Sequence, residues 1–251
     1  MQPTVRPSRL ATLALLAVLS ASASAGIHAQ VPTGPQTDAQ GTATREAGPT
    51  PDPLFGPPPL PPADDAALDA LLTRLRAGDV TIDFTRVRRL YAAGARYRPL
   101  ADEREPRMTA AYVGGDAAGA LVLARALLDD DYLNLEAHSV AALACNRLQD
   151  AACVERHSAM MRGVLGSIQE SGNGRSTRTA YVVVSPAEEY ALIRVAGLRV
   201  LSQSLVHDRD GHAYDLLTVQ DTRTQRELRL YFNIDLVLAA RARAAERASA
   251  R

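Results

Sequence analysis

The fold is decided by the stretch RVLSQSLVHDRDGHAYDLLTVQDTRTQRELRLYFNI, residues 199–234. Three runs within it, residues 199–206, 213–220 and 227–234, are rich in β-branched, aromatic and large aliphatic side chains, which is typical of strands. The pair Asp210-Gly211 lies between the first two runs and favours a tight hairpin turn. The stretch therefore predicts strands that follow one another in an antiparallel order.

The last run also indicates which face of the sheet is buried. Its alternate positions hold two sets of side chains: Leu228, Leu230, Phe232 and Ile234 in one, and Glu227, Arg229, Tyr231 and Asn233 in the other. Because neighbours along a strand point to opposite faces, we expect the apolar set to pack against helices and the other set to face water.

A strand and a helix are expected just before these three runs. The β-branched run at residues 181–184 predicts the strand, and Ser185, followed by Pro186 and Glu188, has the pattern of a capping box with proline at the first helical position. In this interpretation Glu188 and Glu189 serve the start of the helix, where negative charge is favourable. The sheet is thus expected to contain one inserted helix.

The residues from 63 to 170 carry helical periodicity instead. Leu68, Leu71, Leu72 and Leu75, for example, form one apolar face of a helix that begins at Asp64 and Asp65. Helices are predicted in this way over residues 64–77, 83–93, 108–113, 116–129, 135–148 and 151–169. The last two resemble the helix-turn-helix unit of tetratricopeptide repeats, although only about one and a half such units are present, fewer than a stable array needs.

Helices first and strands later indicate an α+β fold. We expect N-terminal helical hairpins similar to those of tetratricopeptide repeats, followed by a small, mostly antiparallel sheet with one inserted helix. The folded part is a single domain, residues 63–251, which divides into a helical part at 63–170, a sheet part at 179–234 and a C-terminal helix at 235–251.

The first 62 residues predict export and a tether. Arg6 and Arg9 precede an apolar run of about ten residues and the small-residue stretch that ends at Ala25, which is the order of a cleavable signal peptide covering residues 1–25. The apolar run is about half the length that crosses a membrane, so no stable membrane insertion is expected after cleavage. Residues 26–62 are rich in proline and predict a disordered tether. The protein is therefore expected to be exported, either periplasmic or secreted.

Charge excludes one class of partner. The chain has 28 basic and 28 acidic residues, and we interpret the basic C-terminal run with Arg241, Arg243, Arg247 and Arg251 as the solvated end of a helix. Nucleic acid is therefore not an expected partner, and a protein or peptide is. No cofactor is implied by any motif.

Several short motifs, in order, resemble an uncharacterised family of exported bacterial proteins, the domain of unknown function 4919. The motifs are Asp83-Phe84 with Arg86, Arg88 and Tyr91, Tyr97 and Pro99, Glu136-Ala137-His138, His157, Ser171-Gly172-Asn173-Gly174, residues 180–184, Glu188-Glu189-Tyr190, Gln203-Ser204-Leu205, Tyr214-Asp215 and Tyr231-Phe232-Asn233. The resemblance covers nearly the whole folded part. It implies no activity and assigns no site.

The two cysteines, Cys145 and Cys153, lie near the end of one predicted helix and the start of the next. In an antiparallel hairpin they could face each other as a disulfide, which an exported protein permits, or pack as two small thiols. A zinc site would draw on His138 and His157 as well, but His138 lies about 10 Å along its helix from Cys145, too far for a shared ion. No metal site is therefore predicted.

Two functions follow from these observations. The first is a non-catalytic binding or accessory protein that uses a groove between the helices and the sheet. The alternative is a hydrolase-like enzyme with a site where helices and sheet meet. No catalytic residue can be assigned, but the candidate site residues for either function are His138, His157, Glu189 and Asp215. An enzyme requires that such groups converge on one pocket, and a binding protein does not.

Overall fold

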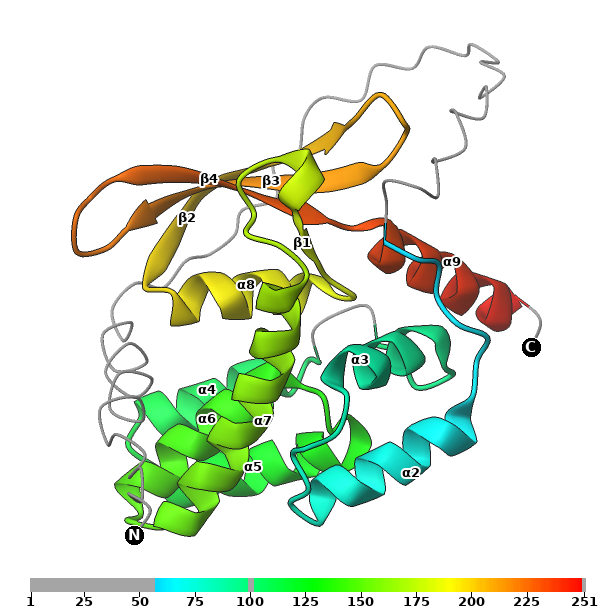
Figure 1. Ribbon diagram of the computed structural model, residues 1–251. Coiled ribbons are helices and arrows are strands. Elements are labelled where there is room, and N and C mark those ends of the chain that lie inside the picture. The colour runs from blue at the N-terminus through cyan, green and yellow to red at the C-terminus, as the bar shows by residue number, and fades with distance from the viewer. Residues whose placement is uncertain (1–56, 99–101, 250–251) are drawn as a thin grey trace, which may run out of the picture.

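The computed structural model describes residues 57–98 and 102–249. It consists of a layer of helices, a four-stranded sheet above that layer, and one helix between the two (Figure 1). The predicted α+β class and the inserted helix are confirmed.

The helices and strands lie where the sequence places them, with ends shifted by at most a few residues. Along the chain they are α2 (Asp65–Arg76), α3 (Phe84–Ala93), α4 (Glu105–Val113), α5 (Ala117–Asp130), α6 (Leu135–Arg147), α7 (Ala151–Glu170), a 3₁₀ turn at Thr177–Thr179, β1 (Tyr181–Val182), α8 (Pro186–Val195), β2 (Leu198–His207), β3 (Ala213–Asp221), β4 (Glu227–Asn233) and α9 (Asp235–Ser249).

Local side-chain chemistry starts most of the helices. Five of them begin at an aspartate or asparagine whose side chain accepts a hydrogen bond from the backbone N–H three residues later. These N-cap residues are Asp64, Asp83, Asp116, Asn134 and Asp150. Each such cap satisfies one backbone donor that a helix leaves free at its start, and is worth about 1 kcal/mol.

Helices α4 to α7 pack against one another in chain order. Their shared core is built largely from small side chains, including Ala120, Ala124, Ala141 and Ala144, all fully or almost fully buried. Small residues let helix axes approach closely, so long side chains are not needed to fill this part of the core.

The sheet has the strand order β1-β4-β3-β2. β2, β3 and β4 form an antiparallel meander, whereas β1 joins the edge of β4 in a parallel pairing of only two residues, Tyr181 with Phe232 and Val182 with Asn233. Helix α8 connects β1 to β2 and lies between the sheet and the helices below it (Figure 1). The parallel neighbours β1 and β4 are thus connected through α8, β2 and β3, and parallel strands require a long connection of this kind.

Strand β4 is buried over only part of its length, which corrects the predicted inward face. Phe232 is fully buried and Leu230 is half-buried, but Leu228 is 38% exposed. Burial increases along the strand on both faces, since Asn233, from the set expected to face water, is only 3% exposed. The turn between β3 and β4 projects beyond α8 (Figure 1), so the start of β4 is less covered than its end.

The packed part of the chain begins before Ala63. Leu60 is 5% exposed and belongs to the main hydrophobic core. Arg243 of α9 donates hydrogen bonds to the carbonyl oxygens of Pro61, at 2.8 Å, and Leu60, and Arg89 of α3 donates to that of Pro59. The end of the proline-rich segment is thus held across α3 and α9, whereas the predicted signal peptide and most of the predicted tether lie outside the described residues.

Within residues 57–98 and 102–249, no helix has the combination of length and apolar character that a membrane crossing requires.

Candidate functional site

The start of α8 holds one group of the polar residues considered for the site. It carries Glu188, Glu189 and Tyr190 in succession, and consecutive residues of a helix point about 100° apart. The three side chains therefore face different surroundings: Glu188 reaches the helical layer, Glu189 is enclosed near Asp215 of the sheet, and Tyr190 is 44% exposed.

Glu188 forms a buried ion pair with Arg88 of α3. The guanidinium donates from Nε to Oε1 and from Nη2 to Oε2, both at 2.7 Å, and both residues are about 5% exposed. Arg88 also donates to Ser167 Oγ and to the carbonyl oxygen of Val182, so it joins α3 to α7, β1 and α8. Two parallel charge-assisted bonds make this pairing strong and fix its geometry.

This ion pair replaces the predicted capping box. The Ser185 hydroxyl makes no capping hydrogen bond, and Glu188 Oε2 accepts from the backbone N–H of Val184 at 2.8 Å. The carboxylate therefore turns toward a fixed cation, which is a better partner than a single backbone donor.

A cavity of about 330 Å³ lies beside the ion pair, between α3, α6, α8 and the turn that precedes α6. Its wall holds Arg88, Arg98 and Arg194 together with Glu105, Asp131 and Glu136, and Tyr91 and Tyr190 add aromatic surface. Most of the charges are matched within the wall.

The matched groups of the cavity wall include one partly buried ion pair and one hydrogen-bonded pair that is more deeply buried. Arg194 Nη1 contacts Glu136 Oε2 at 2.7 Å, and the Tyr91 hydroxyl donates to Asp131 Oδ2 at 2.9 Å. Burial raises the pKa of Asp131, and burial together with the Asp131 charge raises the pKa of Tyr91. The phenol therefore stays protonated as the donor.

Glu189 and Asp215 form a carboxyl pair where α8 meets the sheet. Glu189 is fully buried, and no donor of the described residues faces either of its oxygens. Burial, followed by the charges of Asp215 and Glu188, raises the pKa of Glu189 to about 9, with Arg241 of α9 opposing the shift. Glu189 is therefore neutral near pH 7.

Asp215 belongs to a network of hydrogen bonds that reaches the surface. Its Oδ2 accepts from Gln203 Nε2 at 2.9 Å, and Gln203 Oε1 accepts from the Tyr190 hydroxyl at 2.6 Å. Burial raises the pKa of Asp215 as well. Because Tyr190 also lines the cavity, the network connects the enclosed carboxyl pair to the cavity rim.

The carboxyl pair predicts a pH effect on stability. In the unfolded chain Glu189 loses its proton near its usual pKa of 4.5, and in the folded chain it keeps the proton up to about 9. Between these values the folded state holds the extra proton, so the free energy of unfolding falls as pH rises. Glu189→Gln, which is neutral at every pH and has nearly the same shape, should therefore melt at a similar temperature to the wild type at pH 5 and at a higher temperature at pH 8.

Thermal unfolding of both proteins across this range checks the prediction. Glu227→Gln, an exposed control on β4, should show the same difference from the wild type at both pH values. A melting difference for Glu189→Gln that does not grow with pH would show that Glu189 is ionised in the folded protein.

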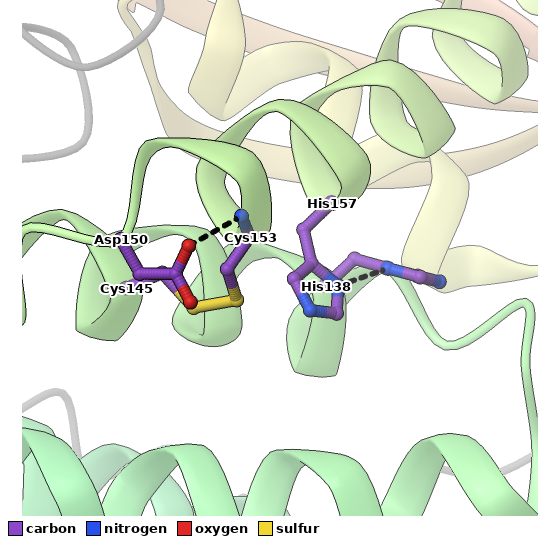
Figure 2. Close-up of a disulfide and its surroundings, with 5 residues drawn as sticks. All are labelled: His138, Cys145, Asp150, Cys153 and His157. Carbon is purple, nitrogen blue, oxygen red and sulfur yellow. Dashed lines mark hydrogen bonds between the residues drawn. A yellow bond between two sulfur atoms is a disulfide. The ribbon is translucent and has the colours of Figure 1, made fainter. Parts of the chain in front are cut away.

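His138 and His157 form a second, separate pair. Their Nδ1 atoms lie 2.9 Å apart, and His138 Nε2 lies 2.8 Å from the carbonyl oxygen of Tyr132. Both rings are buried, which lowers the pKa of His138 to about 3 and that of His157 to about 4, so both are neutral near pH 7. Beside them Cys145 and Cys153 form a disulfide with Cα atoms 5.8 Å apart (Figure 2).

The structure thus brings the four predicted residues together as two pairs. The carboxyl pair lies between α8 and β3, and the histidine pair lies between helices α6 and α7. None of the four residues lines the cavity beside α8.

Sequence reasoning missed the Arg88–Glu188 ion pair and the hydrogen bonds by which Gln203 connects Asp215 to Tyr190. A signal for Arg88 is present, since Phe84, Val87, Arg88 and Tyr91 fall at positions i, i+3, i+4 and i+7 of α3. The arginine therefore lies on the buried stripe, where a charge requires a partner.

Comparison with known proteins gives a family and no function. The profile of a family described as a domain of unknown function, DUF4919, matches residues 65–243. No curated protein and no solved structure matches the chain. Residues 65–243 include every helix and strand from α2 to β4 and most of α9, so the chain belongs to the DUF4919 family.

Proposed function

We propose that this protein is an exported, non-catalytic binding protein that holds a segment of a peptide or protein in the cavity beside α8. The cavity carries this proposal. Its volume of about 330 Å³ is at the lower end of the range for ligand sites, about 300 to 1,000 Å³, and suits one or two side chains of a peptide.

The charges of the wall favour binding over catalysis. Arg88 is paired with Glu188, Arg194 with Glu136, and Asp131 with Tyr91, so these groups present fixed dipoles and ion pairs to a ligand. Groups of alternating sign fit the amides and charged side chains of a peptide, and they are held in place before the ligand arrives, which reduces the ordering cost of binding.

Two features support the location, and the balance of charge bears on the class of partner. The predicted signal peptide implies export, and the disulfide is of a kind that persists in oxidising compartments outside the cytoplasm. The balanced charge continues to argue against nucleic acid.

A hydrolase at the place where helices and sheet meet is the alternative. It would use the Glu189–Asp215 pair, two carboxyl groups whose pKa values are raised by burial, as in acid–base catalysis by carboxyl groups. Glu189 is fully buried, however, and neither carboxyl lines the cavity. We therefore favour binding.

The proposal is tested by blocking the cavity at its rim. Ala187 lines the cavity and is exposed, so Ala187→Trp should occlude the cavity without disturbing the core. Ala152, an exposed residue of α7 away from the cavity, provides the matched control Ala152→Trp. Peptides selected from a random displayed library on the wild-type chain should bind Ala187→Trp at least about tenfold more weakly, a loss of about 1.4 kcal/mol, and Ala152→Trp equally well.

Either of two results would contradict the proposal. One is a failure of the selection to enrich any peptide, and the other is enriched peptides that bind both tryptophan variants alike. Calorimetric titration of the enriched peptides provides the affinities.

A further inference from the structure

Three side chains with metal-ligating atoms meet at the disulfide. The Sγ atoms of Cys145 and Cys153 and a ring nitrogen of His157 all lie within 4.8 Å of one another. Cys153 and His157 are four residues apart on α7, so they share one face of that helix, and Cys145 faces them from α6. All three are buried, with exposures of 0% for Cys145, 9% for Cys153 and 6% for His157.

A chain of hydrogen bonds orients the His157 ring toward the sulfurs. The carbonyl oxygen of Tyr132 can only accept, so His138 Nε2 carries the hydrogen and donates to it. The Nδ1 atom of neutral His138 is then an acceptor, and His157 Nδ1–H donates to it. The free lone pair of His157 is therefore on Nε2, and Figure 2 shows that nitrogen on the side of the ring that faces the disulfide.

This is the arrangement that metal-binding histidines usually have. One ring nitrogen binds the ion, while the other donates a hydrogen bond that fixes the tautomer and the direction of the ring. The sequence argument against zinc concerned His138, which lies too far along α6 from Cys145. In the structure His138 takes the part of the orienting partner, and His157 is the residue beside the sulfurs.

We infer that reduction of the Cys145–Cys153 disulfide creates a metal site of two thiolates and one imidazole, suited to Zn²⁺, with the fourth position open to water or another ligand. Two sulfurs and one nitrogen are ligands that zinc prefers, at about 2.3 Å for Zn–S and about 2.0 to 2.1 Å for Zn–N. At those lengths tetrahedral ligands lie about 3.5 to 3.8 Å apart, which three atoms already within 4.8 Å reach by small movements.

The reaction balances with a dithiol reductant. The dithiol supplies two electrons and two protons, the S–S bond of the protein breaks to give two thiols, and the reductant becomes a disulfide. Binding of Zn²⁺ then releases the two thiol protons and leaves two thiolates on the ion. The oxidised protein has no thiolate to offer, so metal binding at this place is controlled by the redox state.

The inference is tested with Co²⁺, which reports tetrahedral thiolate coordination by its absorption bands. The full mature chain, reduced with a dithiol, freed of reductant without air and checked for native circular dichroism, is titrated with Co²⁺ alone. We expect one Co²⁺ per chain, with tetrahedral d–d bands and a thiolate-to-cobalt charge-transfer band that Zn²⁺ abolishes. The oxidised chain should show neither band.

Variants assign the ligands. His157→Ala should weaken Co²⁺ binding by more than the roughly 10- to 100-fold that loss of an orienting partner costs. His207→Ala removes an exposed histidine and should bind Co²⁺ as the wild type does. Unchanged Co²⁺ affinity in folded His157→Ala, or no tetrahedral bands in the folded reduced wild type, overturns the inference.

A measurement on the wild-type protein alone tests the inference even if the variants fail to fold. Zn²⁺ should slow the alkylation of both thiols in the reduced protein, because metal-bound thiolates react less readily with alkylating agents. Equal alkylation rates with and without Zn²⁺ would likewise overturn the inference.

Discussion

Replacement of Arg88 by methionine is expected to lower the free energy of unfolding by about 3 to 5 kcal/mol. The change removes the guanidinium that holds Glu188 by two bonds of 2.7 Å and leaves a carboxylate about 5% exposed without its cation. It also removes the donors to Ser167 and Val182. Urea unfolding followed by circular dichroism measures the loss.

A matched control and a double variant separate the ion pair from general damage. Arg96 pairs with Asp69 at the surface, with both side chains about half exposed, so Arg96→Met should cost no more than about 1 kcal/mol. Arg88→Met combined with Glu188→Leu should be less destabilised than Arg88→Met alone, since the unpaired buried charge is gone. Equal losses in the free energy of unfolding for Arg88→Met and Arg96→Met would show that the buried ion pair contributes no more to stability than the exposed one.

Phe232→Ala is the second change with a large expected effect, a loss of about 3 to 5 kcal/mol. Phe232 is fully buried on the core face of β4, and its ring lies 5.6 Å from that of Tyr181. Truncation would leave a cavity between β1, β4 and the helices, and packed surroundings relax only partly into such a space.

Two residues of the same strand act as controls in the same urea experiments. Leu228 is on the same side of the strand but 38% exposed, so Leu228→Ala should cost less than about 1 kcal/mol, and Glu227→Ala no more than about 0.5 kcal/mol. A loss for Leu228→Ala as large as that for Phe232→Ala would mean that the inward face is buried along its whole length, as the alternation alone predicts.

The helices were predictable because their signals are local. An aspartate or asparagine starts five of them, and the spacing of leucines marks the buried side. The strand β4 shows the limit of such reasoning. Alternation determines which side chains share a face, but whether Leu228 or Phe232 is covered depends on where α8 ends beneath the sheet, and no periodicity within the strand contains that information.

The sequence predicted which residues are candidates for the site, but it did not predict which of them contact one another. His138, His157, Glu189 and Asp215 were identified by their chemistry, but the pairing of Glu189 with Asp215 depends on how α8 lies against β3. Arg88 and Glu188 are 100 residues apart, and their contact follows from tertiary packing. Likewise, the two cysteines could be placed at a helical hairpin, but whether they face each other depends on how the two helices are rotated.

The parallel pairing of β1 with β4 has a consequence for the order of events as the chain is made. Within the described residues β1 has one strand partner, and that partner ends at Asn233, about fifty residues later. The ribosome makes the chain from the N-terminus, so the helical layer can form before β4, the strand partner of β1, has been made. Contacts of this sequence separation form late because a long loop must close first. A ribosome that stalled before residue 227 would therefore hold a chain whose Tyr181 and Val182 are unpaired and open to other strands.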